Sequence, residues 1–189
     1  MSITVAARAY QRSTFRVIAL LFVTALLAAF LQLANAEPSG AIQPRCNVTV
    51  QDPRSKYNST WSYPMMGGVY AWRDSSPYVN TTFTTSSSAE IKWSIYRFKN
   101  ADGTPNTTTD GKYSGSNGVG TIYLNLNKFA RYSGTTFYNW LRVVVIHEFG
   151  HALLGPTHQP DGTNSVMTAK GAIPSKPTSL DIANIAAIC

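Results

Sequence analysis

The stretch His147-Glu148-Phe149-Gly150-His151 lies near the end of a long apolar segment and carries the strongest structural signal in the chain. On an α-helix, His147 and His151 are one turn apart and point the same way. Two imidazoles on one helix face can bind one zinc ion at about 2.0–2.1 Å. Glu148 would then lie beside the open coordination position, where a carboxylate can accept a proton from a zinc-bound water. The stretch therefore predicts a buried helix with a metal site on one face.

A third histidine follows directly after this helix. Gly155 and Pro156 should end the helix, because glycine adopts a left-handed backbone cheaply and proline cannot continue a helix. The turn can bring His158 back toward the helix, and the chain has only 3 histidines. Three protein ligands plus a water are typical of a catalytic zinc site, whereas the alternative is a helix with ordinary buried or surface histidines. We predict Glu148 as the catalytic residue and His147, His151 and His158 as the metal ligands.

The segment from His147 to His158 resembles the signature of the metzincin zinc peptidases, and most closely their matrixin branch. Ser165-Val166-Met167 resembles the Met-turn beneath the zinc in that clan, and residues 177–182 resemble the start of its C-terminal helix. The resemblance implies an α+β fold, with a twisted, mostly parallel sheet packed on a long active-site helix. It also implies a small C-terminal subdomain that contains the Met-turn and a terminal helix.

The same resemblance implies a zinc-dependent endopeptidase with one catalytic Zn²⁺. Glu148 would act as general base and then donate a proton to the leaving amine. Residues 169–178 would form part of the wall of a specificity pocket. Two assignments remain open: Met167 is either part of the Met-turn or simply a core residue, and Asp181 either caps its own helix or is a buried carboxylate near the Met-turn.

The spacing of the third histidine departs from the family pattern. Leu154 occupies the place of the family's glycine, Gly155 comes one residue later, and His158 follows seven residues after the second histidine instead of six. An extra helical residue adds about 100° of rotation and about 1.5 Å of rise. A left-handed backbone costs leucine about 1–2 kcal/mol and glycine almost nothing, so Leu154 should stay helical and His158 should complete the site. The alternative ligands are a hydroxyl and a carboxylate, those of Thr157 and Asp161.

Residues 1–36 have the composition of a secretory signal peptide. Three arginines come first, residues 17–31 form an apolar run, and Ala34-Asn35-Ala36 offers the small residues that signal peptidase recognises. The run is shorter than the roughly 20 residues of a bilayer span, which makes a membrane anchor the weaker alternative. We expect a secreted protein with no membrane association after cleavage, in which residues 37–189 form one catalytic domain.

The chain has 2 cysteines, Cys46 and Cys189, near the two ends of the expected mature protein. In an oxidising compartment, the simplest interpretation is a disulfide between them. Closing so long a loop would stabilise the fold by roughly 4–5 kcal/mol in the chain-entropy model. The alternative is a free thiol, because Pro44-Arg45-Cys46 resembles the inhibitory cysteine segment of matrixin propeptides, whose thiolate caps the catalytic zinc.

Alternating and turn-rich segments predict the remaining elements. Strands are expected at 47–50, 91–98 and 121–126, and the last of these should lie near a sheet edge that could receive an extended peptide. Residues 65–73 predict a short helix that Gly67-Gly68 weakens. A long loop is expected at 100–120. The main helix should be capped by Thr135 or Thr136 and should carry apolar residues from Phe137 to Leu154. A capping box is expected at Thr178 and Asp181.

The distribution of charged residues limits the classes of molecule that the protein could bind. Lys and Arg total 16 against 9 Asp and Glu, but no Lys/Arg block occurs, which argues against nucleic-acid binding. We expect a monomer that acts on a protein or peptide substrate. Asp102 and Asp110 could bind Ca²⁺, although their spacing does not match an EF-hand and a solvated loop is the alternative. The rival function is a secreted, inactive binding protein that keeps the same fold.

Overall fold

The computed structural model describes residues 46–116, 118–170 and 172–189, so the expected signal peptide and its cleavage site lie outside the described residues. The described part is an α+β fold, as predicted, and its sheet has five strands. Its strands are β1 (Asn47–Gln51), β2 (Asn80–Thr84), β3 (Ile91–Tyr96), β4 (Gly111–Ser116) and β5 (Val119–Asn125). Its helices are the short 3-10 helix η1 (Pro53–Ser55) and the α-helices α2 (Ser59–Ser75), α3 (Leu126–Phe129), α4 (Gly134–Leu154) and α5 (Ser179–Ala186).

The sheet is mostly parallel, with strand order β2-β1-β3-β5-β4. β1 pairs in parallel with β2 and β3, and β3 pairs in parallel with β5. Only β4 runs antiparallel, in a hairpin with β5 that pairs Gly111 with Leu124 at one end and Ser116 with Val119 at the other. The tight turn between the two strands uses Gly118 at φ 71°. The hairpin therefore makes β4 an edge strand.

One sequence-based expectation for the sheet was wrong. Residues 100–120 are not a continuous loop, because they contain all of β4 and the start of β5. The strand expected at 121–126 near a sheet edge corresponds to β5, which lies next to the edge strand β4. β4 contains two glycines and resembles a loop in composition. Gly115 makes room for the ring of Tyr113, because a Cβ at that position would lie 2.5 Å from the Tyr113 hydroxyl.

Helix α2 is longer than the predicted 65–73. Asn58 caps it, with its side-chain oxygen accepting a hydrogen bond from the Trp61 amide. Its glycine pair reflects close packing rather than a weak helix. A Cβ on Gly68 would lie 2.4 Å from a methyl carbon of Val145 in α4, so only glycine allows the two helices to approach this closely.

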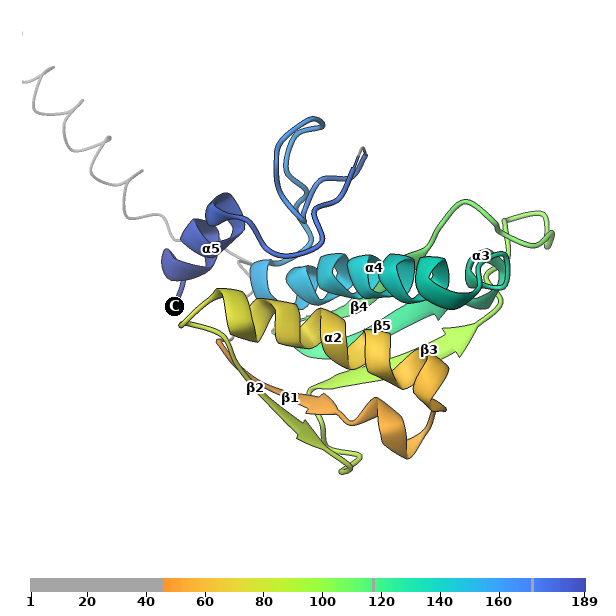
Figure 1. Cartoon of the computed structure of the whole chain (residues 1–189), viewed down its shortest axis with the longest axis horizontal. Helices are drawn as coiled ribbons and strands as arrows, with labels where there is room; N and C mark the ends of the chain where they lie inside the picture. Colours follow the sequence, from red (N-terminus) through yellow and green to blue (C-terminus); the bar gives the residue numbers. More distant parts are fainter. Residues whose placement is uncertain (1–45, 117, 171) are drawn as a thin grey trace, which may run out of the picture. The chain divides into compact units, whose positions relative to one another are not determined.

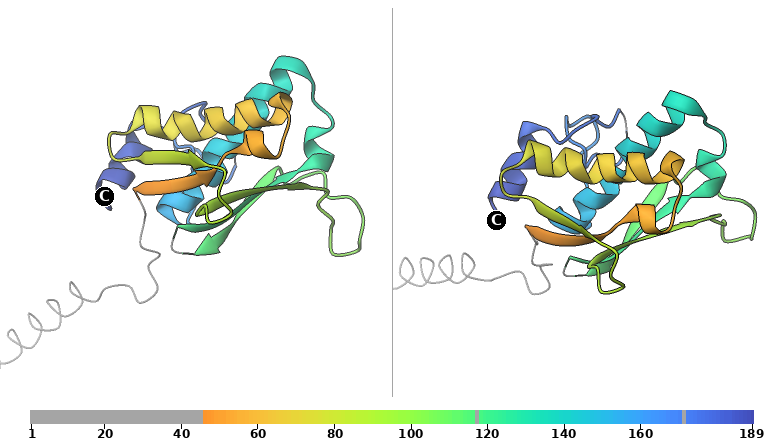
Figure 2. Two further views of the ribbon diagram at one scale, coloured as in Figure 1. Left: turned by 90° about the horizontal axis from the view of Figure 1, so that it is seen from below. Right: turned by 60° about the horizontal axis from the view of Figure 1, so that its bottom comes forward.

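Helices α2 and α4 run side by side and in the same direction across one face of the sheet (Figures 1 and 2). Their contact residues are buried together with those of the sheet in one core, and Trp72 of α2 donates a hydrogen bond from its indole nitrogen to the Ile146 carbonyl of α4 at 2.8 Å. The core contains large apolar side chains, including Trp93, Phe129 and Phe149. This packing fixes α4, which carries the histidine motif, against a rigid layer.

The predicted disulfide is present and joins Cys46, just before β1, to Cys189 at the C-terminus. The free thiol required by the inhibitory-segment alternative is therefore absent, since both cysteines of the chain are in this bond. Their Cα atoms are 5.9 Å apart, a usual separation for a bridged pair. In the described residues, no helix is both long and apolar enough to cross a bilayer.

Candidate metal centre

Helix α4 carries two of the three histidines, His147 and His151, and both are buried. Residues from Val144 to Leu153 are all buried, which explains the unbroken apolar run in the sequence. The helix starts earlier than predicted, at Gly134 after Ser133, rather than with a cap at Thr135 or Thr136. It ends where the turn argument placed its end: Leu154 is helical, and Gly155 has φ 88°. Glycine relieves the strain that a side chain would meet there.

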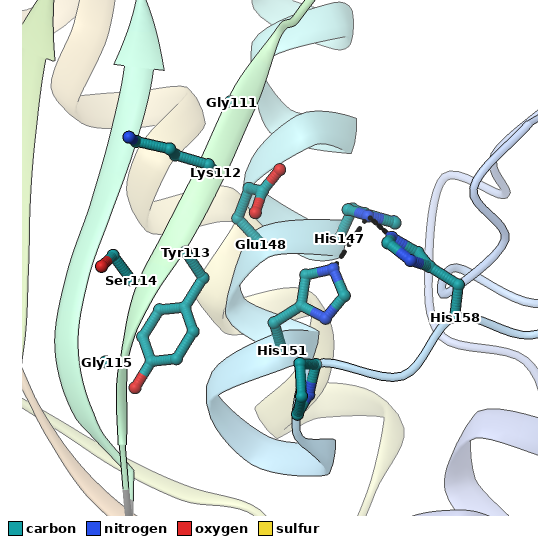
Figure 3. A pocket seen from close by; sticks show the side chains of 10 residues that line it. Gly111, Lys112, Tyr113, Ser114, Gly115, His147, Glu148, His151 and His158 are labelled. Carbon is teal, nitrogen blue, oxygen red and sulfur yellow. Dashed lines mark hydrogen bonds between the residues drawn. The ribbon is translucent and has the colours of Figure 1, made fainter.

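The three histidine rings converge on one point (Figure 3). Nε2 of His147 lies 3.2 Å from Nε2 of His151 and 3.2 Å from Nε2 of His158. Ligands at about 2.0–2.1 Å in a tetrahedral site are about 3.4 Å from one another, which is close to this spacing. His147 and His151 are buried and His158 is exposed. The trio can therefore hold a metal ion, and the turn after Gly155 brings His158 to the two helix histidines.

Backbone carbonyls fix the orientation of the two helix histidines. Nδ1 of His147 lies 2.7 Å from the Val166 carbonyl oxygen, and Nδ1 of His151 lies 2.9 Å from the Gly155 carbonyl oxygen. A carbonyl only accepts, so each Nδ1 carries the hydrogen and each Nε2 presents a lone pair toward the other rings. Lone pairs that face one another at 3.2 Å suit a shared cation, and such second partners also raise ligand basicity.

Burial keeps these two imidazoles neutral. Desolvation lowers the pKa of His151 to about 4, and it also lowers the pKa of His147. The neutral ring is the form that binds a metal ion. The hydrogen bonds to the Val166 and Gly155 carbonyls raise these pKa values, but the lowering by desolvation is larger.

The segment Ser165-Val166-Met167 contacts the helix that carries the histidine motif. Met167 is buried and packs at Gly150, where a Cβ would lie 2.3 Å from the Met167 sulfur. Met167 is therefore a core residue, and its role in a Met-turn stays a prediction.

Asp181 combines both roles that the sequence left open. It is fully buried, and its carboxylate accepts hydrogen bonds from the Thr178 amide at 2.8 Å and from the Val166 amide at 3.1 Å. The Ser165 hydroxyl donates to its other oxygen. The capping box with Thr178 is present as predicted. One carboxylate thus starts α5 and ties it to the turn that orients His147.

Glu148 lies beside the histidine trio with its carboxylate between α4 and β4 (Figure 3). Its side chain is almost completely buried. Desolvation raises its pKa to about 7; the backbone amide of Tyr113 acts in the opposite direction, and the nearby charge of Asp110 adds to the rise. A carboxyl group that titrates near neutrality can both accept and return a proton at ordinary pH.

A cavity of about 540 Å³ joins these groups to the edge of the sheet. Strand β4 forms one wall, the three histidines and Glu148 form the other, and Pro156 lies at the turn. The described residues of 169–178 do not line this cavity, and their place in the wall of a specificity pocket stays a prediction. The wall opposite the helix is β4, which the sequence predicted as part of a loop.

The remaining candidate ligands lie elsewhere. Asp161 is exposed and lies 4.0 Å from the Lys170 ammonium, and Thr157 is also exposed; neither belongs to the histidine group. Asp110 accepts a hydrogen bond from the Trp140 indole at 2.8 Å and pairs with Lys128 at 3.6 Å. Asp102 bonds to Thr104 in its own turn. Neither aspartate belongs to a group of three or more His, Cys, Asp or Glu ligands in the described residues, and Ca²⁺ binding there stays an untested expectation.

Sequence reasoning missed two parts of the site. Tyr113, whose backbone influences the pKa of Glu148, lies on the missed strand β4, and alternation along Gly111–Ser116 is too polar to signal a strand. Val166 acts through its carbonyl, so its side chain gives no sequence signal at all. No family model matches the chain, and no curated protein matches it at a significant level.

Proposed function

We propose that this chain is a secreted zinc-dependent endopeptidase of the metzincin type, with one Zn²⁺ held by His147, His151 and His158. The observation that carries the proposal is Glu148: a buried carboxylate with a pKa of about 7 stands beside three convergent imidazoles in an open cavity. When bound, zinc would lower the pKa of a coordinated water and polarise the substrate carbonyl. A purely structural zinc site would be closed by a fourth protein ligand, whereas the described residues supply three.

The chain's own residues support a general acid–base role. The Glu148 carboxylate can take a proton from the attacking water and return it to the leaving amine. The backbone of Tyr113 on the opposite wall lowers the pKa of that carboxyl group and so favours its charged form, against the effect of burial. Val166 and Gly155 hold the rings of His147 and His151 with their Nε2 atoms toward the cavity.

The edge strand supports a polypeptide as the substrate. β4 pairs with β5 on one side only, so its other side offers backbone groups to an extended chain. Residues 111–115 of this strand line the cavity that contains Glu148. An extended peptide paired with β4 would therefore pass the histidines with its carbonyl groups in reach.

Cleavage of casein with and without a chelator tests the proposal. We expect cleavage by the secreted protein, its loss with 1,10-phenanthroline, and its return on addition of Zn²⁺. A preparation that binds one equivalent of Zn²⁺ and cleaves neither casein nor a mixed peptide library would contradict the proposal and favour the inactive binding protein.

A further inference from the structure

Two hollows lie along the seam between α2 and α4, with volumes of about 560 Å³ and about 510 Å³. Both are lined by Tyr138, so they are adjacent, and the two together are called here the α2–α4 groove. On α2 its residues include Tyr63, Tyr70 and Asp74. Successive helix residues rotate by about 100°, so these positions lie opposite the core positions Met65, Val69 and Trp72. The groove therefore opens on the side of the two helices that faces away from the sheet.

One end of the groove is strongly cationic. Arg142 of α4 and Lys176 of the loop before α5 both line it. The Nε of Arg142 donates to the Gly67 carbonyl at 3.3 Å, which anchors the guanidinium at the groove floor, and neither cation has an ion-pair partner among the described residues.

The only carboxylate that lines the groove is already engaged. Asp74 accepts from Arg73 at 2.8 and 2.9 Å, and Arg73 also covers the ring of Tyr70 at 4.0 Å. Three cations therefore face one anion, and the local charge is two positive. Such a surface attracts a negatively charged partner over a distance of about one Debye length.

Exposed tyrosines extend the groove beyond its charged end. Tyr63 is 59% exposed and Tyr138 is 41% exposed, large values for aromatic side chains. Tyrosines of this kind offer apolar contact area and a hydroxyl at low entropic cost, which is why they are enriched in interfaces. Tyr70 is unavailable as a flat stacking platform, because Arg73 covers one face and its ring packs edge-on against Phe83.

The groove is separate from the metal centre. Arg142 and His147 are five residues apart on α4, so they are rotated by about 140° around the helix. The groove and the metal-centre cavity share no lining residue. A partner in the groove would therefore leave the metal-centre cavity open.

We propose that the α2–α4 groove binds an acidic segment of a partner polypeptide. Its carboxylates would pair with Arg142 and Lys176, and its chain would lie over Tyr138 and Tyr63. The distance along α2 from Tyr63 to Asp74 corresponds to about 16 Å, which an extended chain of about five residues spans. A polypeptide suits this groove because one extended chain can place carboxylates at Arg142 and Lys176 and apolar side chains over Tyr138 and Tyr63. This inference does not depend on the proposed function.

A fluorescein-labelled hexaglutamate peptide tests the proposal by fluorescence anisotropy with the purified protein. We expect saturable binding in low salt, with Kd raised at least about tenfold by Arg142→Gln/Lys176→Gln. The matched control, Lys92→Gln/Lys99→Gln, removes two exposed cations elsewhere, so Kd should change by no more than about twofold. Hexaglutamine should not bind, because it has the same length without the charge.

Three results would overturn the proposal. Equal weakening by the two double variants would mean general attraction to the net positive charge. No saturable binding of hexaglutamate would exclude an acidic peptide site. Tighter, Arg142-dependent binding of a hexameric oligogalacturonate would assign the groove to an acidic glycan. A second variant is needed because Arg142 packs on Gly67, so that its replacement could disturb the contact between α2 and α4. Lys176→Glu changes only the exposed loop, and it should also raise Kd at least about tenfold.

Discussion

His147 and Asp181 are linked through a single residue, Val166. The Val166 carbonyl accepts from Nδ1 of His147 at 2.7 Å, and the Val166 amide donates to the Asp181 carboxylate at 3.1 Å. A helix that begins 32 positions after His147 therefore helps to set the direction of a ring that could bind a metal ion. Asp181 is thus a positioning residue, because it reaches the histidine group only through Val166.

Replacing Asp181 should weaken the metal centre without touching it. In Asp181→Asn, the carboxamide can accept fewer of the hydrogen bonds that Ser165, Val166 and Thr178 now donate, and the charge is lost. We expect a loss of about 2–3 kcal/mol in unfolding free energy and a Zn²⁺ affinity lower by about 10–100-fold. Urea denaturation and competition with a chromogenic chelator measure the two effects. Unchanged metal affinity in a folded variant would show that the turn does not orient His147.

Glu148→Gln should separate metal binding from cleavage. The amide cannot take a proton from water, so the cleavage rate should fall by at least about 100-fold, while all three imidazoles remain. Metal analysis should still give about one Zn²⁺ per chain. The matched control is Asp161→Asn, a carboxylate on the exposed loop near the centre, which should leave both quantities unchanged. Substantial cleavage by the Glu148 variant would remove this residue from the mechanism.

The raised pKa of Glu148 predicts how stability depends on pH. Its folded pKa of about 7 lies above its ordinary value of 4.5, so the protonated form favours the fold. The stabilising contribution is complete below pH 4.5 and is lost as pH rises through about 7. In metal-free protein, Glu148→Gln should therefore have nearly the wild-type stability at pH 4.5 and exceed it at pH 8 by about 3 kcal/mol at most. Because both proteins contain the same histidines, the difference between their denaturation curves isolates Glu148. A constant difference across this range would mean that the carboxyl titrates normally.

The two adjacent glycines of α2 should respond in opposite ways to alanine. At Gly68 a methyl group would overlap Val145 at 2.4 Å, so Gly68→Ala should destabilise the protein by about 1–3 kcal/mol. At Gly67 the nearest atoms are 3.4 Å away, and Gly67→Ala should be neutral or stabilise by up to about 1 kcal/mol. Thermal unfolding followed by circular dichroism measures both. Equal effects would show that α2 and α4 do not approach as closely as described.

The disulfide should contribute to stability at the two ends of the fold. Cys46→Ser/Cys189→Ser removes a bond that closes a loop across 143 positions, and the unfolding free energy should fall by about 2–5 kcal/mol. Non-reducing peptide mapping of the wild-type protein should find the two cysteine peptides linked. Free Cys46 in the purified protein would restore the inhibitory-segment interpretation.

The sequence alone was enough to predict the parts of this protein that depend on local spacing. The positions of His147 and His151 one helical turn apart, the glycine stop at Gly155, the capping box of Thr178 and Asp181 and the disulfide all follow from residue types at short range or from a pair of cysteines. The choice of His158 over Thr157 also follows, because only glycine accepts the left-handed turn without strain.

Tertiary structure decided what depends on partners distant in the chain. Strand β4 has the composition of a loop, and only pairing with β5 and the space made for the Tyr113 ring turn it into the edge strand of the cavity. The length of α2 and its glycine pair make sense only against α4. The hydrogen bond between His147 and Val166 uses the Val166 carbonyl, a backbone group that every residue type has, so no pattern of side chains could predict it.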